Sequence, residues 1–240
     1  MNKLVTIITP TTIDDARIEY LRQLHYNLEE VNETIPIEWV ISINRNDDKK
    51  LPAFLDSPFI KKIYLKQNYG AAVARNMGLA LASGKYVTTC DDDDFMPLHS
   101  ISSRLRILEE NPQLKWVAGL LADVSSSGLV SVWDCPAPHG FNSKGALWKT
   151  WGEPSSMFPL GPTTMMVERQ ALRSVGGWQG LPQGEDFGMV MAVTSAYDGF
   201  MSDEVVYYYR KHEHQMMNSA HFDDLEAIVR IETFERGRIV

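Results

Sequence analysis

Cysteine, basic runs and long apolar runs are all scarce in this chain of 240 residues. Cys90 and Cys135 lack the close spacing of a zinc site and are too few for a disulfide scaffold. A net charge of −8 without a Lys/Arg run argues against nucleic acid as a partner. The apolar stretch at residues 4–8 is too short for a signal peptide, and no run is long enough to span a bilayer. We therefore expect a cytoplasmic protein without a transmembrane segment.

The order of apolar patterns predicts the fold class. Strand-like stretches alternate with stretches of helical periodicity, which is typical of βαβ units. The predicted strands lie at residues 4–8, 37–43, 60–65, 85–90 and 114–121, and the predicted helices at 18–28, 71–82 and 100–110. We expect an α/β fold with a mainly parallel central sheet flanked by helices.

Turn and cap signals separate these elements. Residues 9–12, with the sequence Thr-Pro-Thr-Thr, predict a turn that stops the first strand. Asp14 or Asp15 is the expected N-cap of the first helix, and Gly84 the expected C-cap of the second. The pattern loosens between residues 125 and 162, which is typical of a functional or mobile segment. Residues 222–234 are again helix-like and predict a C-terminal helical tail, either a lid or a partner surface.

Four consecutive aspartates at residues 91–94 follow the predicted strand at 85–90. Because successive side chains of a strand point to opposite faces, Asp91 and Asp93 can share one side while Asp92 faces the other. Neighbouring carboxylates repel one another, and a hard divalent cation such as Mg²⁺, Mn²⁺ or Ca²⁺ is the usual remedy. Open α/β sheets hold ligands at this end of their strands. The segment therefore predicts a cation site for a phosphate-bearing substrate, with a solvated acidic turn as the alternative.

A calcium-binding EF-hand that starts at Asp91 is excluded. Its loop needs Gly at the sixth position and Glu at the twelfth. The sequence places Met96 and Ser102 there.

Several further motifs follow one another along the chain. A predicted strand leads into Thr9-Pro10-Thr11, and Asn68-Tyr69-Gly70 precedes Ala74-Arg75-Asn76-Met77-Gly78-Leu79 and Ala82-Ser83-Gly84-Lys85-Tyr86. The aspartates come next, then Gly176-Gly177-Trp178, Gly184-Glu185-Asp186 and Tyr209-Arg210-Lys211-His212 with Gln215 beyond. Together, over residues 3–215, these motifs resemble the family 2 glycosyltransferases of the GT-A fold, which are inverting enzymes.

The resemblance implies a function and its partners. It implies transfer of a sugar from a nucleotide-diphosphate donor to a hydroxyl of a small-molecule or glycan acceptor, with Mn²⁺ or Mg²⁺ as the cofactor. Residues 1–98 would form a nucleotide-binding half and 99–217 an acceptor-side, catalytic half of one domain, with a tail at 218–240. The resemblance also allows a homo-oligomer.

The resemblance further implies roles for individual residues. The residues implied for the donor are Thr9, Pro10, Thr11, Asn44, Asn68, Arg75, Asp91 and Asp92. Asp93 and His212 would bind the metal, since carboxylate oxygen and neutral imidazole both suit Mn²⁺. Asp94 would cap the next helix or brace the loop.

On the acceptor side, Asp186 would be the general base that takes the proton of the acceptor hydroxyl, and Glu185 would orient the acceptor. Trp178 would stack on a sugar face, with core packing as an equal alternative. Trp133, Trp148 and Trp151 are further candidates for an acceptor site.

One position departs from the family pattern. Where the family commonly carries an acidic residue that reads uracil, this chain has Asn44. An amide offers both a donor and an acceptor, whereas a carboxylate only accepts. The resemblance therefore does not extend to uridine as the base.

Two other functions fit the same broad pattern. A nucleotidyltransferase acting on a sugar phosphate would use a similar sheet, but it usually has a Gly-rich, basic phosphate loop near the first strand, and residues 9–12 contain neither glycine nor a basic residue. A catalytically silent nucleotide-sugar-binding protein is the second alternative.

Overall fold

The computed structural model describes residues 4–46, 50–181, 183–213, 215 and 225–239. Its strands are β1 (Val5–Thr11), β2 (Ile37–Ile43), β3 (Ile60–Tyr64), β4 (Tyr86–Thr89), β5 (Trp116–Val124), β6 (Val130–Val132), β7 (Gly140–Asn142), β8 (Met166–Glu168) and β9 (Gly199–Arg210). Its helices are α1 (Ile18–Thr34), α2 (Ala71–Leu81), α3 (Ser100–Glu110), α4 (Ala146–Trp151), α5 (Arg169–Ser174), α6 (Glu185–Ala196) and α7 (Glu226–Ile239). Two short 3₁₀ turns, η1 (Ala53–Leu55) and η2 (Pro162–Thr164), complete the described elements.

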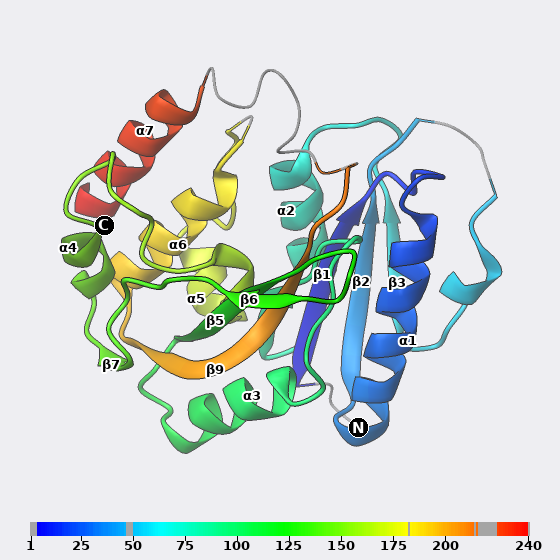
Figure 1. Ribbon diagram of the computed structural model, residues 1–240, viewed down its shortest axis with the longest axis horizontal. Coiled ribbons are helices and arrows are strands. Elements are labelled where there is room, and N and C mark those ends of the chain that lie inside the picture. The colour runs from blue at the N-terminus through cyan, green and yellow to red at the C-terminus, as the bar shows by residue number, and fades with distance from the viewer. Residues whose placement is uncertain (1–3, 47–49, 182, 214, 216–224, 240) are drawn as a thin grey trace.

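One sheet runs through the molecule, in the order β3-β2-β1-β4-β8-β5-β9-β7, with β6 paired to β5 (Figure 1). β3, β2, β1 and β4 are parallel to one another, and β5 and β9 form a second parallel pair. The short strand β8 runs antiparallel between β4 and β5 and so joins the two groups. The mainly parallel α/β sheet expected from the sequence is therefore confirmed.

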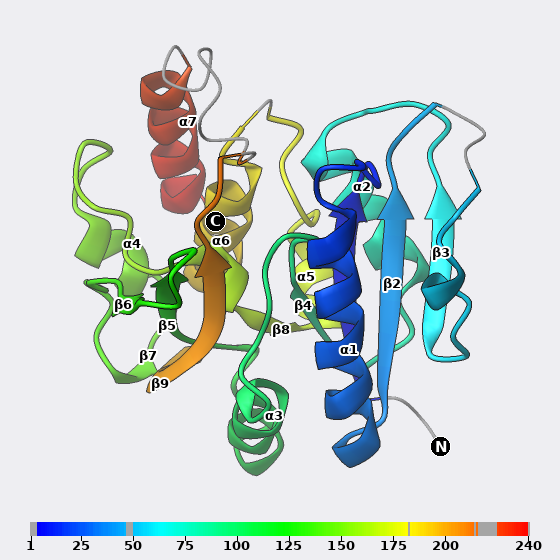
Figure 2. The ribbon, with the colours of Figure 1, turned by 45° about the vertical axis from the view of Figure 1, so that its right-hand side comes forward.

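Helices cover both faces of this sheet (Figure 2). Leu21, Leu24 and Leu28 of α1 pack with Ile7 and Trp39 in one hydrophobic cluster, to which α3 also contributes. The opposite face packs against α2, α4, α5 and α6 in a second cluster. β1 serves both clusters because its side chains alternate: Ile7 enters the first and Ile8 the second. This double burial explains the continuous apolar run at the start of the chain.

β1 continues through Thr11, so the predicted turn at residues 9–12 is wrong as a strand stop. The pairing of β1 with β2 reaches Thr11, whereas its pairing with β4 ends at Ile8. The carbonyl of Ile8 accepts a hydrogen bond from the N–H of Cys90. The main-chain nitrogen of Pro10, two residues later in the strand, faces the same side as the main-chain groups of Ile8. The missing N–H of Pro10 thus lies where β4 no longer offers a partner, which is where a strand tolerates proline.

The two predicted helix caps also differ from the structure. α1 begins at Ile18 after Arg17, without a side-chain cap, because Asp14 instead accepts a hydrogen bond from Ala16 N–H in the preceding turn. α2 ends at Leu81 before an extended Ala82, so Gly84 is no C-cap. Gly84 is needed for close packing instead, since a Cβ there would lie 2.7 Å from the main-chain nitrogen of Thr6.

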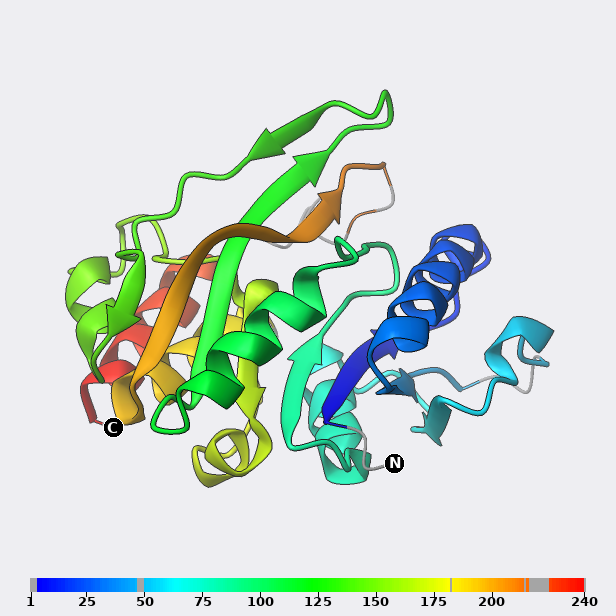
Figure 3. The ribbon, with the colours of Figure 1, turned by 90° about the horizontal axis from the view of Figure 1, so that it is seen from below.

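The second half of the chain contains elements that the sequence did not predict. β8, α5, α6 and β9 fall outside the predicted strands and helices, and the loose segment at 125–162 holds β6, β7 and α4. The hairpin formed by β5 and β6 projects at the top of Figure 3. The predicted helical tail is present as α7, which packs on α6 and α4, while residues 222–224 lie outside the described part. No helix among the described residues is both long and apolar enough to cross a bilayer.

A buried carboxylate connects the amino-terminal ends of β1 and β2 to the turn before β4. Glu38 of β2 is fully buried and accepts hydrogen bonds from Thr6 Oγ1 at 2.7 Å and from Ser83 N and Oγ at 2.8 and 2.6 Å. Lys61 forms an ion pair with the same side chain. Burial alone would raise the pKa of Glu38, but the hydrogen bonds from Lys61, Ser83 and Thr6 outweigh it and lower the pKa to about 2.

We expect Glu38→Gln to lower the free energy of unfolding by about 1–3 kcal/mol at pH 7, because Gln cannot satisfy all these donors. The pKa of Glu38 is 4.5 in its ordinary state and about 2 here. The ionised Glu38 side chain therefore contributes its full stabilisation of the fold above the pKa that it has in the unfolded chain. That stabilisation is lost as the pH falls through the pKa that it has in the folded protein. Urea denaturation across this range should show the two proteins converging at low pH. Glu33→Gln, on the exposed side of α1, serves as the control.

Candidate active site

The four aspartates lie at the carboxyl edge of the sheet, directly after β4. Strands β1 and β2 also end at this edge, which is the upper one in Figure 1. The end of β9 reaches the same place, since Phe95 and Tyr208 form an isolated bridge between the two segments. The edge therefore combines an early motif of the chain with a late one.

Asp94 is the brace that joins the aspartate segment to β9. It is buried and accepts hydrogen bonds from the Tyr207 hydroxyl at 2.8 Å and from the Arg210 N–H at 2.8 Å. The Arg210 side chain donates in turn to the carbonyl of Asp93 at 2.9 Å. Burial, together with Asp93 and Asp91, raises the pKa of Asp94 well above its ordinary value. The brace role is thus the one observed, while His99 rather than Asp94 precedes α3.

This brace brings His212 against Asp93, across 119 positions of sequence. His212 Nε2 lies 3.1 Å from Asp93 Oδ2, and the Tyr20 ring of α1 packs against the imidazole at 4.8 Å between ring centroids. A carboxylate oxygen and an imidazole nitrogen this close fit the donor set of Mn²⁺. No group of three or more His, Cys, Asp or Glu side chains arranged for a metal occurs in the described part of the chain. An ion here would need further ligands from substrate or water.

The predicted placement of Asp92 on the face opposite Asp93 is wrong, because both residues lie in a turn after β4 and their carboxylates contact the same nitrogen of Arg17. Asp92 lies deep in this turn. It is 2% exposed and is held by Thr11, whose hydroxyl donates to Oδ2 at 2.5 Å, and by Arg17 through an ion pair. Burial raises its pKa to about 6, and Asp93 adds to this while Arg17 opposes it. Two side chains predicted to touch the donor, Thr11 and Asp92, therefore bind each other in this structure.

Arg75 of α2 is buried and bridges two carboxylates. Its guanidinium lies 2.7 Å from Asp91 Oδ1 on one side and donates to Glu185 of α6 on the other. Burial alone would lower its pKa, but Asp91, Glu185 and Asp186 outweigh it and raise the pKa above its ordinary value. One side chain thus separates the predicted donor-side and acceptor-side carboxylates.

Asp186 occupies the first turn of α6 beside Glu185. The turn that presents them passes through Gly184, whose φ of +62° lies in the left-handed region that favours glycine. Removal from water raises the pKa of Asp186 to about 7, Glu185 adds to the shift, and Arg75 opposes it. A carboxylate that titrates near neutrality is suited to accept a proton.

Asn44 is engaged with the segment that contains Asn68. Its amide nitrogen donates to Asn68 Oδ1 at 2.9 Å and to the Gly70 carbonyl at 3.1 Å, and its oxygen accepts from the Tyr69 N–H at 2.8 Å. Both donors of the amide and one of the two acceptor positions of its oxygen are taken by this loop. In this structure Asn44 positions residues 68–70 instead of presenting its amide to a ligand.

The tryptophans divide by burial. Trp178 is 4% exposed in the second hydrophobic cluster, and its main chain is held by Asn76. This burial favours the packing alternative over sugar stacking. Trp151 is also buried, and Trp148 packs on Phe234 of α7, whereas Trp133 is 41% exposed beside Tyr209.

Sequence reasoning missed three residues of this site: Arg17, Tyr20 and Tyr207. Arg17 and Tyr20 lie three residues apart and so share one face of the first turn of α1. That spacing is the only sequence signal for them, and the acidic residues Asp14 and Asp15 give a competing cap signal. Tyr207 lies two residues before Tyr209 of the late motif, and no local pattern distinguishes it.

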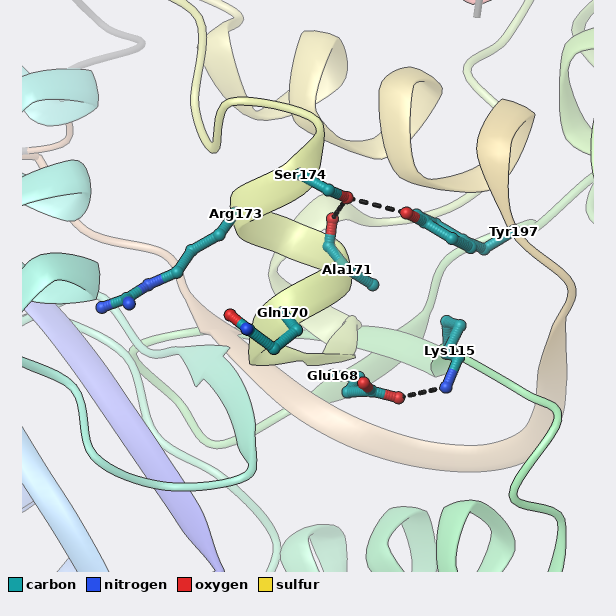
Figure 4. A pocket seen from close by; sticks show the side chains of 7 residues that line it. All are labelled: Lys115, Glu168, Gln170, Ala171, Arg173, Ser174 and Tyr197. Carbon is teal, nitrogen blue, oxygen red and sulfur yellow. Dashed lines mark hydrogen bonds and ion pairs between the residues drawn. The ribbon is translucent and has the colours of Figure 1, made fainter.

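A cavity of about 500 Å³ lies away from these residues (Figure 4). It is lined by Lys115, Glu168, Gln170, Ala171, Arg173, Ser174 and Tyr197. Lys115 precedes β5, so the cavity belongs to the amino end of that strand. Four of its polar side chains form two pairs: Lys115 forms an ion pair with Glu168 at 2.5 Å, and Ser174 Oγ lies 2.7 Å from the Tyr197 hydroxyl.

Comparison with known proteins gives matches in sequence. A sequence model of the family described as glycosyl transferase family 2 matches residues 7–130. An uncharacterized glycosyltransferase of Rickettsia conorii is 42% identical over 50 residues, which is 21% of this chain and 8% of that protein. Another, from Rickettsia bellii, is 32% identical over 96 residues, which is 38% of this chain and 12% of that protein. The chain thus aligns with only a small part of each of these relatives.

Solved structures give matches in fold. TarS 1–349 of S. aureus, in complex with UDP-GlcNAc, superposes with a TM-score of 0.69 at 18% identity, covering 95% of this chain and 66% of that one. The mannosyltransferase PcManGT of Pyrobaculum calidifontis, in complex with GDP-Man and Mn²⁺, gives 0.63 at 17% identity, covering 98% and 64%. The chain spans just under two thirds of each, and at these identities the likeness shows a shared fold.

We expect Arg75→Met to lower the free energy of unfolding by about 3–5 kcal/mol, since removing one partner of a buried ion pair leaves charges uncompensated. Arg75 opposes the rise in the pKa of Asp186 to about 7, so without the guanidinium the carboxyl of Asp186 would keep its proton to a higher pH in the folded state. The loss should therefore grow as the pH rises from 5 to 8. Denaturation with urea across that range tests this. Arg173→Met, which removes hydrogen bonds to main-chain carbonyls of α2, should show no such pH dependence.

Proposed function

Because the chain belongs to glycosyl transferase family 2, as its motifs predicted, we propose that it transfers a sugar from a nucleotide-diphosphate donor to a hydroxyl-type acceptor, with inversion and with a divalent cation. The observation that carries this proposal is the Arg75 bridge. It sets Asp91, on the donor side, and Glu185, next to the candidate base, on either side of one guanidinium. Residues 1–98 would bind the nucleotide and 99–217 the acceptor.

Asp93 and His212 are the proposed ligands of the cation. Their contact at 3.1 Å supports this, and so does the Mn²⁺ complex of a protein with the same fold. When bound, Mn²⁺ or Mg²⁺ would neutralise the diphosphate and stabilise its charge as the leaving group. Tyr207 and Arg210 hold the segment so that Asp93 keeps its position against His212.

Asp186 is the proposed general base, and Glu185 would orient the acceptor. Attack with inversion needs a carboxylate on the side opposite the leaving group, within reach of the acceptor hydroxyl. The raised pKa of Asp186, about 7, matches this work near neutral pH. Arg75 would hold Glu185 in place, because the two form an ion pair. Trp178 is left out of the acceptor site because of its burial.

The nucleobase and the sugar of the donor are left unspecified in this proposal. The two structural neighbours carry UDP-GlcNAc and GDP-Man, which differ in both. Pro10 and Asn68 remain as proposed donor contacts, and the engagement of Asn44 with its loop does not favour uridine. Thr9 is fully buried, and its hydroxyl donates to the Cys90 carbonyl and accepts from Trp39 Nε1, so it is left out of the donor site.

Nucleotidyl transfer to a sugar phosphate is the alternative reaction, and a silent nucleotide-sugar binder is the alternative without turnover. Product analysis separates them: free nucleoside diphosphate indicates glycosyl transfer, pyrophosphate indicates nucleotidyl transfer, and no product indicates a binder. The cytoplasm is the proposed setting, supported by the unpaired state of Cys90 and Cys135.

We expect UDP or GDP with Mn²⁺ to raise the thermal midpoint of unfolding of the wild-type protein, because binding stabilises the folded state. Asp93→Asn should lose most of this Mn²⁺-dependent rise, and EDTA should abolish it in the wild type. Asp56→Asn, which alters a carboxylate that is 74% exposed, serves as the control. If no nucleoside diphosphate changes the midpoint of the wild type, the proposed function is contradicted.

We expect Asp186→Asn to lower the turnover number at least about 100-fold while leaving Mn²⁺-dependent nucleotide binding intact. In the wild type, the base works only when ionised, so activity should rise with pH through about 7 and then level off. The residual activity of the variant should lack this step. Release of nucleoside diphosphate, measured from pH 5.5 to 9, tests both points, with the exposed Asp203→Asn as the matched control. Normal turnover by Asp186→Asn would remove this residue as the base.

A further inference from the structure

Arg17 reaches into the aspartate segment from the start of α1. Its guanidinium forms an ion pair with Asp92 Oδ1 and lies 3.2 Å from Asp93 Oδ2. The same Asp93 oxygen is 3.1 Å from His212 Nε2. The oxygen proposed for the cation is therefore already in contact with a guanidinium in this structure.

The position of Arg17 is unfavourable apart from these contacts. It is the N-cap residue of α1, where the helix dipole is positive and an acidic or neutral polar side chain is preferred. Its Nε is buried without a hydrogen-bond partner among the residues that the structure describes. The turn before it passes through Ile13, a β-branched residue with a φ of +52°, which costs conformational energy. Asp92 and Asp93 are the anions that offset these costs.

We propose that Arg17 is a ligand of the donor diphosphate that, before the donor binds, occupies the aspartates in place of the cation. This inference rests on the proposed function. When the cation and nucleotide bind, the guanidinium gives up Asp93 and takes the diphosphate as its new anionic partner, while its main chain stays at the first turn of α1.

Electrostatics requires such an exchange. A divalent cation on Asp93 Oδ2 would lie within a few ångströms of the guanidinium, and like charges at that distance repel strongly where water is restricted. The diphosphate brings negative charge to the same place. The planar fork of arginine matches phosphate oxygens, which makes the diphosphate a suitable new partner.

A purely structural ion pair would behave differently. If Arg17 only fastened α1 to the aspartates, its removal would loosen the site and weaken the cation and the nucleotide together. If it competes with the cation and then binds the diphosphate, its removal acts on the two ligands in opposite directions. The signs of the two effects therefore separate the two roles.

The test uses Arg17→Gln in the full chain, with Arg22→Gln as the matched control. Arg22 lies on the same helix and pairs with Glu19 at 3.5 Å with 44% of its side chain exposed. Binding of Mn²⁺ alone is measured from the electron paramagnetic resonance signal of free Mn²⁺. Binding of UDP and of GDP is measured by calorimetry at saturating Mn²⁺.

We expect Arg17→Gln to bind Mn²⁺ alone about tenfold more tightly than the wild type, and the nucleoside diphosphate about tenfold more weakly. Arg22→Gln should match the wild type in both. Should Arg17→Gln fail to fold, Arg17→Lys keeps the charge but not the fork, and it should weaken the nucleotide more than it alters Mn²⁺ binding.

Unchanged or weaker binding of Mn²⁺ alone by Arg17→Gln would overturn the competition. Unchanged binding of the nucleoside diphosphate would overturn the role as its ligand. If the wild type binds neither UDP nor GDP, the proposed function fails instead, and the Mn²⁺ measurement still decides whether Arg17 competes for Asp93.

Discussion

The arrangement of the site depends on the guanidinium of Arg75. Six carboxylates, the four of residues 91–94 with Glu185 and Asp186, converge at one edge of the sheet, and no chain would bring them together without buried positive charge. Arg75 supplies that charge where the two halves of the sequence meet, with Asp91 on one side and Glu185 on the other. Since each carboxylate holds the same rigid fork, the distance between the early and late motifs is set by one side chain rather than by two flexible loops.

A second constraint sets the direction of the aspartate segment. Asp94 accepts hydrogen bonds from the Tyr207 hydroxyl and the Arg210 N–H. The Arg210 side chain donates a hydrogen bond to the carbonyl of Asp93. These contacts make the end of β9 and the end of β4 one unit, so that His212 meets Asp93 without a ligand to hold it. The proposed cation site is therefore held in place by hydrogen bonds among Asp94, Tyr207, Arg210 and the main chain of Asp93, while Arg17 also contacts its Asp93 oxygen.

Much of the first half of the chain could be predicted from the sequence, because there the local apolar pattern and the position in the fold agree. The strand at Ile37–Ile43 and the helix at Ser100–Glu110 have the bounds that the sequence predicts. The strand is buried on both faces and gives a continuous apolar run, and the helix buries one stripe and gives a helical apolar period. Of the two roles expected for Asp94, a helix cap or a brace, the brace is the one observed. Strand alternation could not place Asp92, because residues 92 and 93 lie in a turn and share Arg17. The contact of Asp93 with His212 was expected from the family resemblance alone.

The remainder was decided by contacts distant in sequence. β8 has three residues, and α6 is apolar on all sides because it is buried, so neither shows a periodic pattern. The local pattern predicts Gly84 as a helix cap, whereas the close approach of β1 is what requires glycine there. Arg17 breaks the rule for the start of a helix, and local propensity fails most often where function imposes another requirement.

The engagement of Asn44 has a consequence for redesign. An exchange of Asn44 for aspartate, made to install a uracil-reading carboxylate, would replace a group that donates to Asn68 and Gly70 with one that only accepts. Two carbonyl oxygens would then face a carboxylate, and the loop before α2 would be pushed outward. The position of this loop consequently depends on a single amide, so that an aspartate at position 44 would require compensating substitutions at positions 68–70.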